Sequence, residues 1–292
     1  MSLGLSECRP ISDHRYLAAE SPIWDDRRGC AFFVDIKGHL LCAHDPATGA
    51  TRHWPVAEDI GFVALTTGEG LVLGLKSGLY LFDLQSRVMT RLPVLDVAED
   101  ERLNDGKVAP DGSLYFGTMA LDAAAGRGRL FRLAADLSLE LIDRDYGVPN
   151  GPAFTPDGAL LHCDTSVNRI HQLCRDGDGW HRVKTLEIPG KYGHPDGIEL
   201  DPAGNLWAGL WGGSGLLTIA ASSGLMQHLP LPASYVTSLC PIGTDATTLL
   251  VTSARTPLLR GEPQRQPHDG AVFIARLESS WPARSCRFDV DW

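Results

Sequence analysis

Short runs of apolar and β-branched residues recur along the whole chain, and glycine, proline, aspartate and asparagine separate them. Those four residue types form turns, and runs bounded by them are typical of short β-strands. Apolar positions at helical spacing are scarce. The pattern therefore predicts an all-β protein, with strands at residues 31–36, 71–75, 79–84, 114–118, 130–133, 160–163, 206–210, 249–252 and 271–275.

A unit consisting of a turn and the strand after it repeats along the chain. Pro110, Pro156 and Pro202 each stand in a turn that leads into an apolar run, and 46 residues separate each proline from the next. Looser copies of the unit begin near residues 26, 69 and 243, which makes six units. A repeat of this length with several strands and no helix is typical of a propeller blade.

The repeat therefore predicts a six-bladed β-propeller. Chain remains outside the six units at both ends, and we expect the two ends to pair and close the ring, with residues 11–17 beside the C-terminal strands. Closure removes the exposed sheet edges that would otherwise pair with other chains. A β-sandwich is also rich in strands, but it predicts no long fixed period. No linker or shift in composition is evident, so we expect one domain over residues 1–292.

Polar residues occupy one phase of the repeat. Six residues before each turn, four of the six units carry a side chain with an oxygen atom of a carboxylate or an amide: Glu20, Asn104, Asn150 and Asp196. The other two units have Val63 and Thr237 at that position. Equivalent positions of successive blades surround one central axis, so these four side chains are expected to converge.

Two carboxylates and two amides supply the hard oxygen ligands that calcium, magnesium and manganese accept, and zinc also accepts carboxylate oxygen. An alternative is that Asn150-Gly151 and Asp196-Gly197 are simply turn dipeptides. The shared phase of four such residues favours a metal site. Two roles stay open for Asn104: it binds the metal through a water molecule, or it binds a substrate.

Charge and cysteine content narrow the possible partners. The formal net charge of −10 argues against a nucleic-acid partner and suits a cation or a neutral small molecule, although it also serves solubility. The seven cysteines include no Cys-x-x-Cys pair, which argues against a disulfide framework and favours a reducing compartment. With neither a signal peptide nor a membrane-spanning run evident, we expect a cytoplasmic protein without a membrane partner. The oligomeric state is not readable.

Five ordered segments resemble the signature segments of the regucalcin/gluconolactonase family, also called the senescence marker protein family. They extend over most of the chain, from Glu20 to about Arg255, and read Ala-Glu-Ser-Pro-Ile-Trp at 19–24, Arg-Leu-Asn-Asp-Gly-Lys at 102–107, Gly-Thr-Met at 117–119, Pro-Asn-Gly at 149–151 and Pro-Asp-Gly at 195–197. The resemblance implies a six-bladed propeller with one divalent metal ion in the central channel. It also implies hydrolysis of a sugar lactone. The segment that ends at Arg255 is similar to the bacterial sugar-lactonase branch of the family, and this similarity implies a pentonolactone or hexonolactone as substrate.

The resemblance also implies roles for single residues. Glu20, Asn150 and Asp196 match the family's metal ligands, and Asp196 matches its catalytic acid/base as well. Arg102 and Asn104 match substrate-binding residues. Asp122 takes the place of an acidic substrate residue, where many members carry glutamate. The side chain of His194, close to Asp196, either shapes the pocket or lies at the surface.

These roles imply a chemistry for lactone hydrolysis. A divalent metal ion polarises the carbonyl oxygen, and Asp196 acts as the general acid/base. The metal stays unidentified, because oxygen ligands suit calcium, manganese, iron(II) or zinc. Two alternatives remain: a metal esterase of the paraoxonase or phosphotriesterase kind, and a non-enzymatic calcium-binding propeller. The particular lactone is not readable from the sequence.

Overall fold

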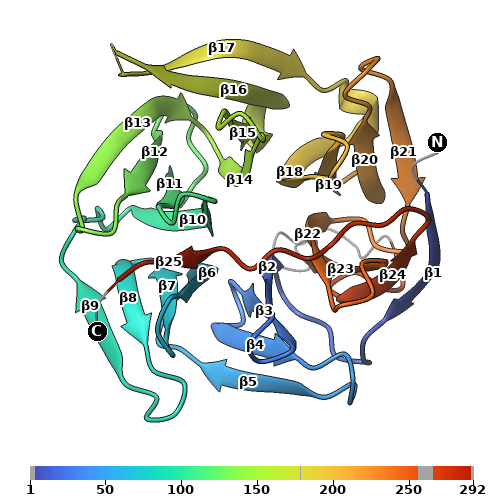
Figure 1. Cartoon of the computed structure of the whole chain (residues 1–292), viewed down its shortest axis with the longest axis horizontal. Helices are drawn as coiled ribbons and strands as arrows, with labels where there is room; N and C mark the ends of the chain where they lie inside the picture. Colours follow the sequence, from blue (N-terminus) through green and yellow to red (C-terminus); the bar gives the residue numbers. More distant parts are fainter. Residues whose placement is uncertain (1–3, 178, 256–265, 291–292) are drawn as a thin grey trace.

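The computed structural model describes residues 4–177, 179–255 and 266–290. Over these residues the chain forms six β-sheets arranged as blades around a central axis, which confirms the predicted all-β propeller (Figure 1). The described residues also include two short 3₁₀ turns, η1 (Thr165–Val167) and η2 (Gly190–Tyr192). No helix in the described residues is long and apolar enough to cross a bilayer.

Each blade is built on four antiparallel strands that follow one another from the axis outward. The first blade has β2 (Ala19–Asp25), β3 (Cys30–Asp35), β4 (Leu40–His44) and β5 (Thr51–Pro55). The second has β6 (Ile60–Thr66), β7 (Leu71–Leu75), β8 (Gly78–Phe82) and β9 (Met89–Leu92). The third has β10 (Glu101–Val108), β11 (Leu114–Ala120), β12 (Gly128–Leu133) and β13 (Leu139–Tyr146).

The remaining blades follow the same plan, and the last one is completed by the N-terminus. The fourth blade has β14 (Pro149–Phe154), β15 (Leu160–Asp164), β16 (Arg169–Asp176) and β17 (Gly179–Glu187). The fifth has β18 (His194–Leu200), β19 (Leu206–Trp211), β20 (Gly215–Ile219) and β21 (Met226–Pro230). The sixth has β22 (Val236–Ile242), β23 (Thr248–Ser253), β24 (Phe273–Leu277) and β1 (Leu5–Pro10).

The predicted turns join the innermost strand of a blade to the second strand. In three blades the turn is closed by a backbone hydrogen bond of 2.8–3.0 Å, from Ala109 to Ser113, from Thr155 to Ala159 and from Asp201 to Asn205. The glycine of each turn has a φ between +79° and +87°, a conformation that costs glycine little because it lacks a Cβ atom. The 46-residue spacing thus reflects three hairpins of the same geometry.

The two ends of the chain pair and close the ring as predicted, but the pairing strand differs from the predicted segment. The strand beside β24 is β1, which lies just before the predicted segment 11–17. That segment adds backbone bonds from Ile11 to Val272 and from Tyr16 to Gly270. Most of β1 is exposed and polar, so it shows no apolar alternation from which a strand could be predicted.

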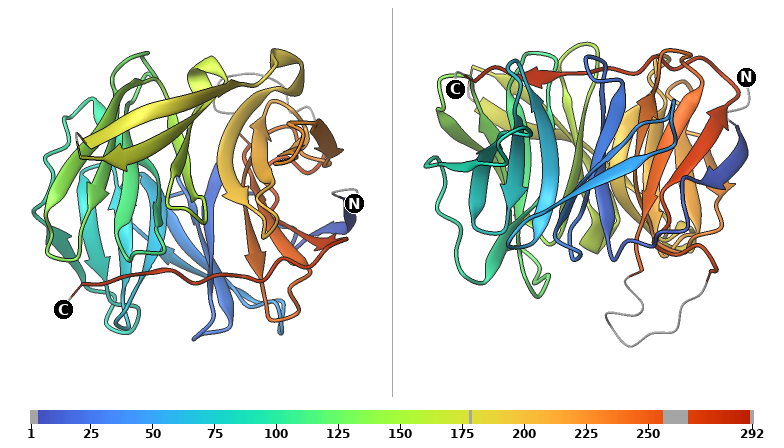
Figure 2. Two further views of the ribbon diagram at one scale, coloured as in Figure 1. Left: turned by 45° about the horizontal axis from the view of Figure 1, so that its top comes forward. Right: turned by 90° about the horizontal axis from the view of Figure 1, so that it is seen from below.

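The segment after β24, which we call the C-terminal strap, crosses one face of the ring, as Figure 2 shows, and includes β25 (Arg287–Phe288). This short strand pairs in parallel with β6, the innermost strand of the second blade. Phe288 is fully buried there. The strap therefore ties the end of the chain across to a blade far away in sequence.

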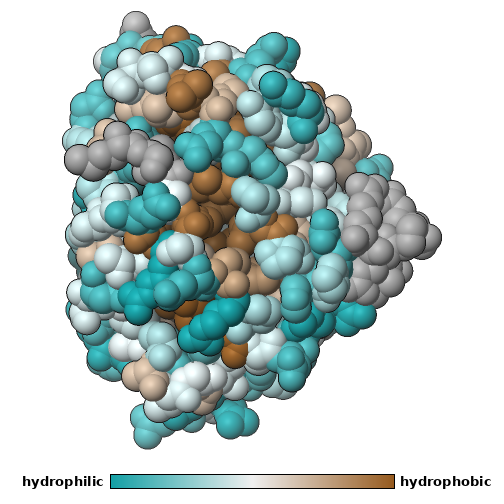
Figure 3. Space-filling view, turned by 90° about the vertical axis from the view of Figure 1, so that its right-hand side faces the viewer, coloured by the Kyte–Doolittle hydropathy of each residue, from teal (hydrophilic) through white to brown (hydrophobic). Residues whose placement is uncertain are grey.

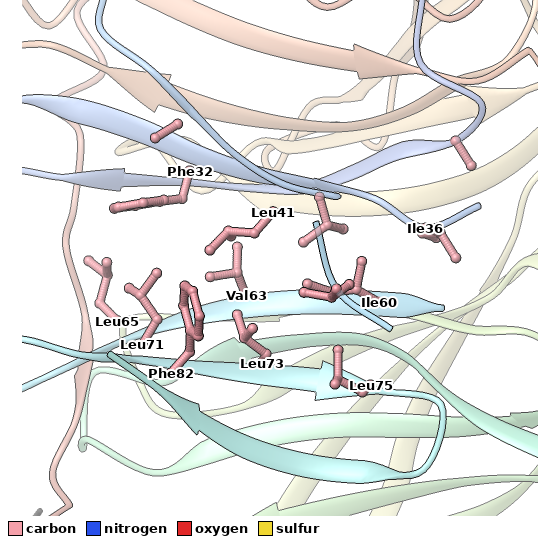
Figure 4. Packing of buried hydrophobic residues seen from close by; sticks show 14 of the residues in the cluster. Phe32, Ile36, Leu41, Ile60, Val63, Leu65, Leu71, Leu73, Leu75 and Phe82 are labelled. Carbon is pink, nitrogen blue, oxygen red and sulfur yellow. The ribbon is translucent and has the colours of Figure 1, made fainter. Parts of the chain in front are cut away.

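Apolar side chains fill the spaces between neighbouring blades. Figure 4 shows this packing for the first two blades, where Phe32 and Leu41 meet Val63, Leu73 and Phe82. Val63 stands at the repeat phase that carries polar groups in four other blades, and its side chain lies in this core. Burying a side chain of this size contributes about 1.5–3 kcal/mol. At the side of the ring near β21 and β1, apolar side chains also gather in a hollow surrounded by polar ones (Figure 3).

Candidate functional site

The four polar residues at the shared repeat phase lie on innermost strands. Glu20, Asn104, Asn150 and Asp196 belong to β2, β10, β14 and β18, which face the axis (Figure 1), and each side chain is at most 5% exposed. The strand register is irregular at or directly after each of the four. Such bulges twist a strand and turn its side chains in a new direction, and they are frequent beside active sites.

These bulges decide between the two interpretations of the Asn-Gly and Asp-Gly dipeptides. Asn150-Gly151 and Asp196-Gly197 lie inside β14 and β18, so they are not hairpin turns. The residues after Glu20 and Asn150 have positive φ, +51° at Ser21 and +36° at Gly151. The backbone is thus bent directly after two of the candidate metal ligands.

A chain of hydrogen bonds fixes the two amides. Asn104 Nδ2 donates to the Pro149 carbonyl (2.7 Å) and to Asn150 Oδ1 (2.6 Å). Asn150 Nδ2 donates to Thr165 Oγ1 (2.7 Å). A carbonyl can only accept, so the Asn104 atom that faces Pro149 must be the NH₂ group. It follows that both Oδ1 atoms, each with a lone pair to spare, are the oxygens that can serve a cation or a hydroxyl group.

The two carboxylates lie in a site that disfavours their charge. Burial raises the pKa of Glu20 well above its usual range, and Asp196 and Asp105 raise it further. Burial also raises the pKa of Asp196, again with Asp105 adding to the effect and Arg102 opposing it. Among the described residues, Glu20 Oε1 is buried without a hydrogen-bond partner. Buried charges are normally paired or bind a metal, so a positive ligand fits here.

The donor set matches a divalent cation that prefers oxygen. Glu20 and Asp196 supply carboxylates, and Asn150 and Asn104 supply amide oxygens. No group of three or more histidine, cysteine, aspartate or glutamate side chains in the described part of the chain is arranged to hold a metal. Candidate ligands that include amide oxygen are typical of calcium and related hard ions rather than of a structural zinc site.

An open cavity of ≈ 580 Å³ lies above these groups. Polar side chains from five innermost strands form part of its lining, including Thr237 of β22, and apolar side chains such as Met119, Leu121 and Trp211 form another part. A separate cavity of ≈ 100 Å³ lies at the other ends of the innermost strands, under the C-terminal strap. There, Lys107 and Glu199 form an ion pair of 2.6 Å between β10 and β18.

The remaining predicted residues also line the large cavity. Burial lowers the pKa of Arg102, while Asp59, Glu20 and Asp196 favour its charged form, and Arg102 Nη1 donates to the Leu103 carbonyl (3.0 Å). Asp122 is exposed, and its Oδ1 accepts from the Ala124 backbone (3.0 Å). Asp122 therefore stands at the rim.

Other residues of the cavity were not predicted, or their role was left open. Lys37 and Thr165 line the cavity but belong to no repeated position, so the sequence gives no signal for them. Lys37 is paired with Asp59, which also contacts His39 Nε2 (2.9 Å). His194 is exposed, lines the cavity and contacts Asn168 Oδ1 through Nδ1 (2.6 Å). Arg255 is described, but it is not among the residues that line this cavity.

Comparison with known proteins gives the family. The model of the SMP-30/Gluconolactonase/LRE-like region matches residues 18–255. The 6-deoxy-6-sulfogluconolactonase of Pseudomonas putida is 30% identical over 263 residues, which cover 88% of this chain and 90% of that protein. The L-arabinolactonase of Azospirillum brasilense is 31% identical over 274 residues, covering 91% and 90%.

A solved structure supports the same fold. The crystal structure of regucalcin from Agrobacterium tumefaciens, described as a calcium-binding protein, superposes with a TM-score of 0.83. It is 24% identical in sequence, and the match covers 96% of this chain and 97% of that one. At this level of identity the likeness shows that the two chains share a fold.

Proposed function

We propose that this chain, which belongs to the SMP-30/gluconolactonase/LRE-like family, hydrolyses the ring ester of a sugar lactone with the help of one divalent metal ion. Its relatives include proteins named as lactonases of a gluconolactone derivative and of arabinolactone. Opening a lactone is hydrolysis of a carboxylic ester. The substrate class is therefore a small cyclic sugar ester, and the enzyme class is a carboxylic ester hydrolase.

One observation carries the proposal: Glu20 Oε1, a buried carboxylate oxygen without a hydrogen-bond partner among the described residues, lies close to a second buried carboxylate, Asp196, at an open cavity. Two such groups repel each other, and a cation removes the repulsion. Glu20, Asn150 and Asp196 would hold the metal. When bound, the ion supplies a positive charge that polarises the lactone carbonyl and stabilises negative charge on its oxygen.

Asp196 is the proposed general acid/base. Water adds to the carbonyl carbon and loses a proton to the carboxylate, and the bond between that carbon and the ring oxygen then breaks. The same proton passes to the ring oxygen, which becomes a hydroxyl group of the product acid. In the metal-free site burial and Asp105 raise the pKa of Asp196, so its carboxylate has a higher proton affinity there than that of an exposed aspartate.

The cavity walls are proposed to orient the sugar. Arg102 offers guanidinium donors, and Asn104 offers Oδ1, because its NH₂ group is occupied by β14. Asp122 at the rim accepts from outer hydroxyl groups. Holding the lactone in one orientation can contribute several kcal/mol to the reduction of the barrier.

The test is a pH-indicator assay over a panel of pentonolactones and hexonolactones, with protein that has been stripped of metal and then given calcium, zinc, manganese or iron(II). We expect no turnover without metal and restored turnover with at least one ion. Asp196→Asn should be inactive, whereas Asp157→Asn, which makes the same change in an exposed turn, should retain activity. Turnover of aryl esters or organophosphates in place of lactones would favour a different metal esterase. Binding of metal without any turnover would favour a calcium-binding propeller.

A further inference from the structure

Asp105 is a buried carboxylate next to the site, and it has no part in the proposed reaction. It follows Asn104 on β10, is 3% exposed and does not line the large cavity. Its Oδ2 accepts from the Gly151 backbone (2.7 Å), and its Oδ1 accepts from the Gly106 backbone (2.8 Å). Both of its oxygens are thus used to hold backbone.

Asn104 and Asp105 together form hydrogen bonds to three consecutive residues of the neighbouring blade. Asn104 binds the Pro149 carbonyl and Asn150 Oδ1, and Asp105 binds the Gly151 amide. The candidate ligand Asn150 is the middle one of these three residues. Its backbone is therefore held on both sides by β10, and its side chain is held by Asn104 and Thr165.

Gly151 is also packed closely against the next blade. A Cβ atom on Gly151 would lie 2.5 Å from the Ile198 backbone nitrogen and 3.1 Å from the Gly197 Cα. The backbone of β14 therefore touches β18 directly after Asp196. Gly151 is therefore hydrogen-bonded to β10 through Asp105 and in contact with β18, so it lies between the strands that carry Asn104 and Asp196.

We infer that Asp105 is a positioning residue, which fixes the backbone after Asn150 and so aims the Asn150 amide oxygen at the metal. The inference rests on the proposed function, since it takes Asn150 as a ligand. An aspartate suits this role because it accepts on both oxygens at a short reach. An asparagine would turn an NH₂ group toward one of the two backbone amides, where a donor faces a donor. Partners of this kind, which orient metal ligands, typically change metal affinity about 10–100-fold when they are replaced.

The experiment measures calcium and zinc binding by calorimetry on the stripped full-length protein. Asp105→Asn should raise the dissociation constant about 10–100-fold. Asp111→Asn, an exposed turn aspartate of the same blade, should leave it unchanged. The lactonase activity lost in Asp105→Asn at low metal concentration should return when excess metal is added, which a purely structural defect would not allow. If Asp105→Asn does not fold, Asp105→Ser, which also lacks one of the two acceptors, takes its place.

Three results would overturn the inference. One is a folded Asp105→Asn protein that binds metal within about twofold of the wild type. Another is a lowered melting temperature with unchanged metal affinity, because Asp105 would then only stabilise the blade. The third is full recovery of affinity in Asp105→Glu, which keeps the charge but displaces the carboxylate. The Asn150→Ala variant separates the two proposals. If Asn150→Ala binds metal as tightly as the wild type, the proposed ligand set is refuted. If Asn150→Ala binds metal more weakly but Asp105→Asn does not, only the role of Asp105 is refuted.

Discussion

Replacing Glu20 by glutamine should have opposite effects on the metal-free and the metal-bound protein. In the absence of metal the Glu20 carboxylate is buried, and Asp196 and Asp105 repel its charge. One of its oxygens has no hydrogen-bond partner in the part of the chain that the structure describes. Because its pKa is raised in the folded state, the metal-free protein should lose stability as the pH rises from the ordinary glutamate pKa through the raised value. Glu20→Gln removes that loss, so at pH 8 the metal-free variant should melt higher than the metal-free wild type.

The metal-bound state should show the reverse. A ligand present at one hundred times its dissociation constant stabilises a protein by about 2.7 kcal/mol. For a chain of 292 residues, the entropy of unfolding is about 0.6 kcal/mol per kelvin, so the melting temperature should rise by about 4 °C. Glutamine offers the metal no charge, and this rise should largely disappear in Glu20→Gln.

The assay is thermal unfolding of both proteins at pH 8, with a chelator and with saturating calcium or zinc. Glu69→Gln serves as the matched control, since Glu69 has the same side chain at an exposed turn. The control should behave as the wild type in both conditions. The reasoning fails if Glu20→Gln lowers the melting temperature of the metal-free protein, or if metal stabilises the variant as much as the wild type.

Further predictions concern catalysis, binding and the core. Asp196→Asn should lower kcat about 10²–10⁴-fold in steady-state lactonase assays, the usual contribution of a general acid/base. Arg102→Ala should lower kcat/KM about 10–100-fold while calorimetry shows metal still bound, because it removes charged hydrogen bonds to substrate only. Burial lowers the pKa of His162 to about 3, so between pH 7.5 and 5 this histidine becomes charged only in the unfolded state. The free energy of unfolding of the wild type should therefore fall by about 2 kcal/mol over this pH range, and denaturant titrations of His162→Phe should lack this loss. Phe116→Ala, which empties a fully buried site between Phe62 and Phe131, should cost about 3–5 kcal/mol in the same titration, and a loss below about 1 kcal/mol would contradict the described packing.

The repeat allowed much of this fold to be predicted, because the same hairpin recurs with the same spacing. Pro110, Pro156 and Pro202 mark turns of one geometry, and the apolar strand after each turn is buried between blades. The innermost strands were not recognised as strands. They carry polar, glycine and proline residues at their bulges, and locally such residues resemble turns. The shared phase and the family resemblance, rather than any local strand pattern, revealed Glu20 and its equivalents.

Contacts between segments that are far apart in the sequence could not be predicted from local patterns. The segment that closes the ring was misplaced, because β1 is exposed and its pairing depends on a strand at the other end of the chain. The strap to β6 had no signal for the same reason. Lys37 reaches the cavity from the turn after β3 and Thr165 from η1, and neither stands at a repeated position that the sequence reveals, so neither could be found before the blades were assembled.

The central claim is that Glu20, Asn150 and Asp196 together hold one divalent metal ion. Its most direct test is a crystal structure of the metal-loaded protein with anomalous diffraction recorded at the absorption edge of the metal. We expect one strong peak at the cavity, about 2.0–2.6 Å from a carboxylate oxygen of Glu20, a carboxylate oxygen of Asp196 and Oδ1 of Asn150. A metal bound elsewhere in a protein that opens lactones, or an active crystal form without any such peak, would contradict it.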